Sequence, residues 1–178
     1  MASSSQLTAA KVAERNAESG EHYITRNRAE YMAMLGNAAG GGAIIGLTTW
    51  GKFLLYGLAL SPFWMGFAAG MNYALSFVLV QLLHLTVATK QPAVTAPAMV
   101  AKLRDMHTPG AVRRFVDEVD NLFRSLVAAI AGNLALVVPV VLLLSWGLQT
   151  FGGQPMISAS QAEHVLHDMD VLGPTALF

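Results

Sequence analysis

The 178-residue chain contains no cysteine and few charged residues. Without cysteine it can form no disulfide, no thiolate metal site and no cysteine nucleophile. Charged residues make up 12% of the chain, whereas soluble domains carry about 25%. The polar N-terminus, Met-Ala-Ser-Ser-Ser-Gln, lacks the apolar core of a cleaved signal peptide. These absences argue against a disulfide-rich secreted domain and against an ordinary soluble one.

Hydrophobic residues make up 54% of the chain and gather in long runs. Two runs lie in residues 34–89 and meet at the short break Leu60-Ser61-Pro62, and a third covers residues 126–148. Each has the roughly 20 residues that an α-helix needs to cross ~30 Å of hydrocarbon. Because the break is so short, residues 34–89 are predicted to form an antiparallel transmembrane hairpin. Residues 126–148 are predicted to form a third span.

The predicted fold class is therefore all-α, a multi-pass transmembrane helical protein. Its predicted segments are a cytoplasmic N-terminal segment (1–33), the hairpin (34–89), a cytoplasmic loop (90–125), the third span (126–148), an outer segment (149–170) and an apolar end (171–178). From Val112 the apolar residues of the loop recur at i, i+3, i+4 and i+7, which predicts an amphipathic helix on the membrane surface or against the bundle. The apolar end resembles the first turns of a fourth span, which indicates a fragment of a longer protein.

Local signals predict the ends of several helices. Asn27 followed by Glu30 is typical of a capped helix start, and this helix is expected to run into the first span. Pro92 is expected to end the second span, and Pro139 to kink the third. A short helix is expected at residues 158–169.

The cationic residues predict the orientation. All except Lys52 either precede the first span or lie between the second and third: Lys11, Arg15, Arg26, Arg28, Lys90, Lys102, Arg104, Arg113, Arg114 and Arg124. By the positive-inside rule, these two regions are cytoplasmic. The aromatic residues near the opposite boundary agree with this orientation: Tyr56, Phe63, Trp64, Trp146 and Phe151. The expected location is a bacterial inner membrane, with the N-terminus in the cytoplasm and residues 149–170 outside.

Glycines spaced four apart indicate close helix packing. Three small-xxx-small pairs are present: Gly36 with Gly40, Gly42 with Gly46, and Gly66 with Gly70. We expect them to let the two helices of the hairpin approach each other, although glycine is also simply common in membrane helices. A phosphate-binding loop is the poorer alternative, because no Gly-Lys-Ser/Thr follows the glycines.

Few polar residues in the predicted spans could carry chemistry. The candidates are Lys52, Asn72, Gln81, His84 and Asn133. Lys52 is either functional or extends its amine outward to the membrane surface. Asn133 is predicted to form an interhelical hydrogen bond with Asn72 or Gln81. No span contains Asp or Glu, so a proton relay would lack its acidic partner.

The outer segment holds a weak metal-site candidate, His164, His167 and Asp168. Histidines three residues apart share a helix face, and imidazoles with a carboxylate suit Zn²⁺. The pattern is not His-Glu-x-x-His and has no distant third ligand, so these residues are equally explained as helix surface. We therefore predict neither a metal nor another cofactor.

The expected partners follow from the surface. The 90–125 loop has six cations and four acidic residues, an excess that suits an anionic lipid surface better than a DNA duplex. We expect contact with the lipid bilayer and with other transmembrane helices, either of the full-length protein or of a second copy. Nucleic acid is not an expected partner of this region.

Three runs carry a family resemblance: residues 20–31, 77–92 and 164–174. They resemble a bacterial integral-membrane family labelled site-specific recombinase, from about residue 18 to the end. The resemblance implies a longer membrane protein and supplies no established catalytic residue. Tyrosine recombinases need Arg and His clustered around a nucleophilic Tyr, and serine recombinases need an N-terminal catalytic Ser domain. The sequence shows neither pattern.

Three functions stay open, and the sequence leaves it undecided whether the protein is an enzyme. The favoured one is a non-enzymatic membrane scaffold. A transporter or channel component would use Lys52, Asn72, Gln81 and Asn133 to line a path. A DNA recombinase would bind the duplex through residues 90–125.

Overall fold

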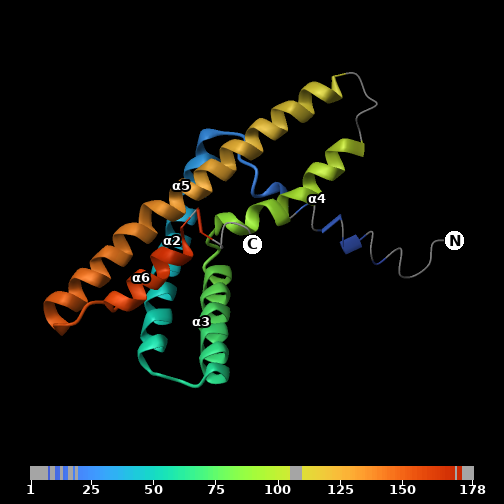
Figure 1. Ribbon diagram of the computed structural model, residues 1–178. Helices are drawn as coiled ribbons and strands as arrows, with labels where there is room; N and C mark the ends of the chain where they lie inside the picture. Colours follow the sequence, from blue (N-terminus) through green and yellow to red (C-terminus); the bar gives the residue numbers. More distant parts are fainter. Residues whose placement is uncertain are drawn as a thin grey trace.

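The computed structural model describes residues 20–104 and 110–170, together with Thr8, Lys11, Val12, Glu14, Arg15, Glu18, Leu172 and Gly173. Every regular element in this part of the chain is a helix, so the all-α prediction is confirmed for it. In order, the elements are α2 (Arg28–Gly57), α3 (Pro62–Leu82), the 3-10 helix η1 (Ala88–Lys90), α4 (Gln91–Arg104), α5 (Ala111–Gly152) and α6 (Ala159–Asp168) (Figure 1). The predictions for residues 1–19 and 171–178 fall almost entirely outside the described residues.

The predicted hairpin is present, since α2 and α3 lie side by side and antiparallel (Figure 1). At the start of α2, the side-chain oxygen of Asn27 accepts from the backbone N–H of Glu30 at 2.9 Å, which confirms the predicted cap. The turn passes through Ala59 with a positive φ of 49°. α3 then begins with Pro62, a position where the missing N–H costs no helical hydrogen bond.

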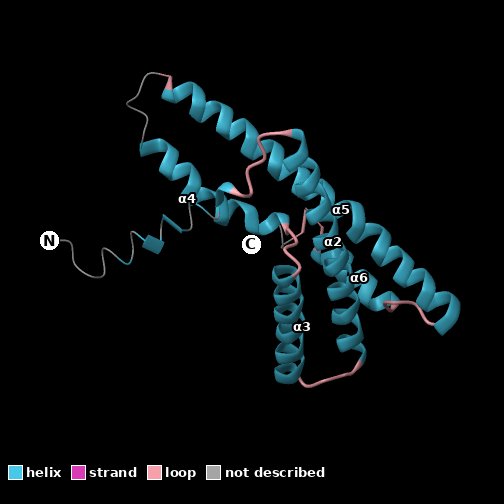
Figure 2. Cartoon of the chain, turned by 180° about the vertical axis from the view of Figure 1, so that it is seen from behind, coloured by secondary structure: helices cyan, strands magenta, loops and turns pink. Residues whose placement is uncertain are grey.

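α2 is the middle helix of the described chain. It packs against α3 on one side and, more extensively, against α5 on the other, as the view from behind in Figure 2 also shows. α2 and α5 run parallel, because Ala38 lies against Asn133 and, further along both helices, Gly46 lies against Val140. α5 and α2 are therefore parallel, and α3 is antiparallel to both.

α5 is one continuous helix of 42 residues. It joins two elements that the sequence predicts separately, the amphipathic helix from Val112 and the third span of residues 126–148. The composition changes from charged to apolar near Leu126, but no helix-breaking residue stands there. The helix also continues through Pro139. The change in polarity therefore does not mark the end of a helix, and the prediction of two separate helices was wrong.

The second apolar run is helical over a shorter range than predicted. α3 ends at Leu82, and residues 83–87 leave the helix, with His84 at a φ of 53°. The backbone N–H of Thr86 donates to the carbonyl oxygen of Asn37 in α2 at 3.1 Å. Thr86 and Val87 are buried as a result. Pro92 does not end α3 but lies in the first turn of α4, where proline is well tolerated.

Two of the described helices, α3 and α5, are long and apolar enough to cross a membrane. α2 does not reach the same mean hydropathy, although the sequence predicts a span there. The glycines and threonines of α2 lower its hydropathy, and several of them are buried against its neighbours: Gly41, Gly42, Gly46 and Thr48. Two of the three predicted spans therefore have the length and hydropathy of a membrane-crossing helix, and α2, which lies between them, is less apolar.

Candidate functional site

The contact between α2 and α5, which we call the glycine seam, brings two backbones together. A Cβ added to Gly42 would overlap the backbone of Asn133. From the opposite side, a Cβ on Gly132 would lie 2.6 Å from the carbonyl oxygen of Leu35. No real Cβ makes such contacts, so the backbones of the two helices can approach this closely only because both positions are glycine.

The glycines predicted to mediate packing divide into two groups. Those at the glycine seam face α5 or residues 83–87: Gly40, Gly42 and Gly46. Those without any atom within 4 Å of an added Cβ are Gly36, Gly66 and Gly70. The close approach of α2 is therefore made to α5 and not, as expected, to its hairpin partner α3. The glycine pair of α3 faces away from the described chain.

Asn133 is the polar centre of the glycine seam and is only 8% exposed. Its Nδ2 donates to the carbonyl oxygens of Ala38 at 2.6 Å and Thr86 at 2.9 Å. Its Oδ1 accepts from the backbone N–H of Ala88 at 2.8 Å. The amide thus binds α2 and the connection after α3 at the same time. Two of its bonds, to Thr86 and Ala88, satisfy backbone groups in the connection after α3 that no long helix satisfies, and the third reaches a carbonyl oxygen inside α2.

The predicted partners of Asn133, Asn72 and Gln81, were wrong for this reason. Residues 83–87 leave the helix, so their peptide groups need partners, and the side chain of α5 that reaches them is Asn133. Asn72 instead donates to the carbonyl oxygen of Thr48 in α2 at 2.9 Å. Gln81 is exposed nine residues further along α3.

The remaining polar candidates do not converge with these. Lys52 is half-buried, and its Nζ lies 5.7 Å from the ring centre of Tyr56, one turn nearer the hairpin turn. This cation–π contact directs the amine along its own helix toward the turn. His84 is exposed beyond the end of α3. Gln81 and His84 line one pocket together with Asn37 and Thr86, whereas Lys52, Asn72 and Asn133 are not among its lining residues.

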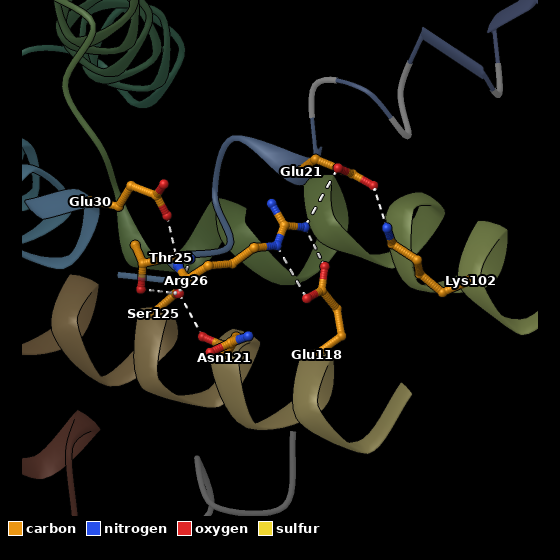
Figure 3. Close-up of polar contacts among 8 residues, drawn as sticks. All are labelled: Glu21, Thr25, Arg26, Glu30, Lys102, Glu118, Asn121 and Ser125. Atoms are coloured by element: carbon orange, nitrogen blue, oxygen red, sulfur yellow. Dashed lines mark hydrogen bonds and ion pairs between the residues drawn. The ribbon is translucent and has the colours of Figure 1, made fainter. Parts of the chain in front are cut away.

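A group of charged residues lies where the segment before α2 meets α4 and the first part of α5 (Figure 3). The guanidinium of Arg26 donates to both carboxylate oxygens of Glu118, from Nε at 3.3 Å and from Nη2. Nη2 also lies 3.5 Å from Glu21, whose other oxygen lies 3.0 Å from Lys102 Nζ. These four residues, the charged clamp, connect the segment before α2 with α4 and α5.

The electrostatics of the charged clamp stabilise its ionised form. The hydrogen bond from Arg26 lowers the pKa of Glu118 below its usual value of 4.5, although burial opposes this. The same bond raises the pKa of Arg26. The pKa of Glu30 is lowered chiefly because it accepts from the backbone N–H of Arg26, at 2.7 Å. All three groups are charged at neutral pH, so none is suited to exchange protons with a substrate.

Next to the charged clamp, the hydroxyl of Ser125 is completely buried. Its Oγ donates to the carbonyl oxygen of Asn121 at 2.7 Å and accepts from the backbone N–H of Thr25 at 2.7 Å. A serine has one hydroxyl proton, so Thr25 Oγ1 must be the donor in its 2.8 Å contact with Ser125 Oγ. With its proton committed and no access to solvent, this hydroxyl joins two segments and cannot act as a nucleophile.

The weak metal candidates lie on α6, where a helix was predicted. His164 Nε2 lies 3.5 Å from Asp168 Oδ2, and His167 Nδ1 lies 3.9 Å from Asp168 Oδ1. All three side chains are more than half exposed. Among the residues that the structure describes, no group of three or more His, Asp or Glu could hold a metal ion. The geometry is that of ion pairs on a helix surface.

Sequence reasoning missed the carboxylates of the charged clamp and the Thr25–Ser125 pair. Arg26 and Glu118 are 92 residues apart, and Thr25 and Ser125 are 100 apart. No local pattern marks such pairs. The only usable signal was that Glu118 falls near the apolar face of the helix predicted from Val112.

In the described residues, the fold and these sites define an all-α protein with two helices of membrane-spanning length, α3 and α5, and a charged clamp that connects the segment before α2 with α4 and α5. The chain belongs to the site-specific recombinase family, whose model matches residues 1–178. The resemblance found in the sequence is thereby confirmed and covers the whole chain. The chain matches no curated protein and no solved structure.

Several residues of the types that a recombinase uses make contacts within the described chain. Arg26 is paired with two carboxylates, although 40% of its side chain is exposed, and Ser125 is completely buried. Tyr23 and Tyr31 are partly buried and pack against the apolar cluster around Met34. These four residues therefore have structural contacts in the described fold.

Proposed function

We propose that this chain is a membrane-embedded helical scaffold without catalytic activity of its own. The observation that carries the proposal is the surface of α3. Of its 21 residues only Val80 is buried, and large apolar side chains such as Phe63 and Leu82 are 73% and 70% exposed. In water such a helix would expose far more apolar surface than the few hundred Å² typical of monomers.

The C-terminal half of α5 has the same character. Leu143 and Trp146 are 65% and 61% exposed, and α5 carries no charged residue after Arg124. Charged contacts are found instead around residues 20–30 and the first part of α5. A bilayer accounts for this separation, because hydrocarbon covers the apolar helices and water solvates the charged end.

The packing of α2 between α3 and α5 supports its assignment as the middle span. A helix covered by α3 and α5 need not be strongly apolar, and glycine favours close packing between helices in lipid. Because α2 and α5 run parallel and α3 returns, the hairpin turn and the segment after residue 148 belong on one side. With the cations on the other side, the positive-inside rule makes the N-terminus cytoplasmic, in a bacterial inner membrane.

Scaffolding is favoured over transport and over DNA recombination. The polar groups inside the fold bind the chain's own backbone, as Asn133 does three times. The cations Arg26 and Lys102 are paired with carboxylates and so are poor ligands for DNA phosphates. On this proposal, the exposed faces of α3 and α5 contact lipid or other transmembrane helices.

Membrane fractionation tests the proposal. The protein should stay in the membrane pellet after alkaline carbonate washing and enter solution only with detergent. Recovery of a monodisperse protein from the soluble fraction would contradict it. The full-length protein should also show no binding to duplex DNA at low salt, and saturable binding would revive the recombinase alternative.

Single-cysteine labelling tests the orientation, and the absence of cysteine from this chain makes it direct. Ser61→Cys in the hairpin turn and Ser160→Cys in α6 should react with a membrane-impermeant maleimide from outside the inner membrane. Asp117→Cys, at the charged end, should react only after lysis. The reverse pattern would contradict the proposed orientation, and equal labelling of all three in intact cells would contradict membrane insertion.

A further inference from the structure

A second group of cations lies at the charged end, in a groove between the first turn of α2 and α5. The groove has a volume of about 350 Å³ and is lined by Arg28, Tyr31, Phe123, Arg124 and Val127. We call it the arginine groove. Both arginines are exposed, and neither forms an ion pair with any residue that the structure describes.

The nearest acidic residues do not neutralise it. Asp120 stands one turn before Arg124 on α5 but forms no ion pair with it in the described structure. Glu30 is bonded to Asn27 and to the backbone of Arg26. Arg28 is moreover the first residue of α2, where the helix dipole disfavours a cation. Two like charges in one groove call for an anion between them.

An apolar strip leads away from the arginine groove along one face of α5. Its members recur at intervals of three or four residues and are 45–65% exposed: Phe123, Val127, Ile130, Leu134 and Val138. The strip runs from the groove toward the end of α5 that lies with the hairpin turn. An anion that carries a hydrocarbon chain would contact both features, whereas a free phosphate would contact only the arginines.

We propose that the arginine groove binds the phosphate headgroup of an anionic phospholipid, with an acyl chain lying on the apolar strip. This inference rests on the proposed membrane location. It adds a specific lipid site to a general preference for bilayers. The guanidinium groups of Arg28 and Arg124 would each donate to phosphate oxygens, a geometry that arginine favours.

Native mass spectrometry of the detergent-purified protein tests the proposal, with phosphatidylglycerol and phosphatidylcholine titrated separately. The wild type should retain phosphatidylglycerol more strongly than phosphatidylcholine. The double variant R28Q/R124Q should bind phosphatidylglycerol about thirtyfold more weakly, since each lost cation weakens the attraction to an anionic lipid about fivefold. Its affinity for phosphatidylcholine should not change.

The control is R15Q/R113Q, which removes the same charge at exposed arginines outside the groove. It should keep the wild-type preference, and an equal loss in this control would show that net charge alone attracts the lipid. Displacement of phosphatidylglycerol by excess inorganic phosphate would show a phosphate site with no role for the acyl chain. Either result, or equal binding of the two lipids, would overturn the inference.

Failure of this inference can be told apart from failure of the proposed function. If the protein is extracted by carbonate without detergent, the membrane proposal fails. If it stays in the membrane but shows no preference for phosphatidylglycerol, only the arginine groove is misassigned. Tryptophan fluorescence of both double variants should match the wild type, which confirms that the exposed substitutions leave the fold intact.

Discussion

The two sides of α2 are built differently. Toward α5, backbone approaches backbone at Gly42 and Gly132, and Asn133 bonds to main-chain groups. Toward α3, side chains of α3 reach across to α2: Asn72 donates to the carbonyl oxygen of Thr48, and Ser76 contacts the hydroxyl of the same residue. The chain reaches α3 through a short turn but reaches α5 only after some 50 residues more.

This difference indicates which of the two interfaces, α2–α3 or α2–α5, depends on specific contacts for its geometry. A short connection holds α3 next to α2 at little entropic cost, so weak contacts are enough to orient it. α5 is not held in this way, and its position depends on contacts that only one arrangement can make. We therefore expect changes on the α5 side of α2 to destabilise the protein more than matched changes on the α3 side.

Substitution of Gly42 in the glycine seam should show the largest difference in stability between the two sides of α2. Gly42→Leu would place a side chain on the backbone of Asn133, which cannot move aside. We expect the free energy of unfolding in detergent to fall by about 3 kcal/mol or more. Gly70→Leu is the matched control, because nothing lies within 4 Å of its Cβ position. A similar loss in both variants would refute the asymmetry.

Removal of the seam amide should have the next largest effect. Asn133→Leu would leave the carbonyl oxygen of Thr86 and the N–H of Ala88 without this partner and remove a bond to α2, at a cost of about 2–3 kcal/mol. Asn72→Leu removes a single interhelical bond and should cost about 0.6 kcal/mol. Denaturant titration of the two variants in the same detergent would measure the ratio. Equal values would mean that Asn133 has no special role.

The charged clamp should contribute less, and its contribution should depend on pH. Because the pKa of Glu118 is lowered in the folded state, its ion pair stabilises the fold above the usual pKa of about 4.5. That stability is lost as the pH falls through the lowered pKa. Glu118→Gln should therefore cost about 1–2 kcal/mol at neutral pH and almost nothing in strong acid. Asp120→Asn, which breaks no ion pair among described residues, serves as the control, and a pH-independent loss in Glu118→Gln would contradict the assignment.

The smallest effect is expected on the α3 side. Ser76→Ala removes the bond that Ser76 Oγ accepts from Thr48 Oγ1 at 2.6 Å. Thr48 keeps its bond to the carbonyl oxygen of Ile44, so no polar group is left unpaired. We expect a loss of about 0.5 kcal/mol. A loss as large as that of Asn133→Leu would show that α3 is as strongly specified as α5.

Local features of the fold were predictable. Asn27 and Glu30 correctly placed the start of α2, and Ser158 with Gln161 forms a capping box where the last helix was expected. These motifs act between residues three apart, so one sequence is enough to recognise them. The hairpin turn was predictable for the same reason.

For the candidate site, the sequence predicted the kind of interaction but not the partners. Asn133 was expected to bond across helices and does so, but its partners depend on residues 83–87 leaving α3. The bonds of Thr86 and Asn133 to α2 outweigh the helical preference of an apolar run. The charged clamp depends on pairs far apart in the sequence, Arg26 with Glu118 and Glu21 with Lys102, which no local pattern reveals.

By itself, the sequence determined that the chain is helical, where its long apolar stretches lie and that its cations are kept apart from them. These properties depend on composition and on neighbours along the chain. Only the tertiary structure decided that α5 is one helix, that α2 packs its glycines against α5, and that Asn133 binds the turn after α3. The physical reason is that buried backbone groups must find partners wherever the chain brings them, and these partners lie 45 to 100 residues away along the chain.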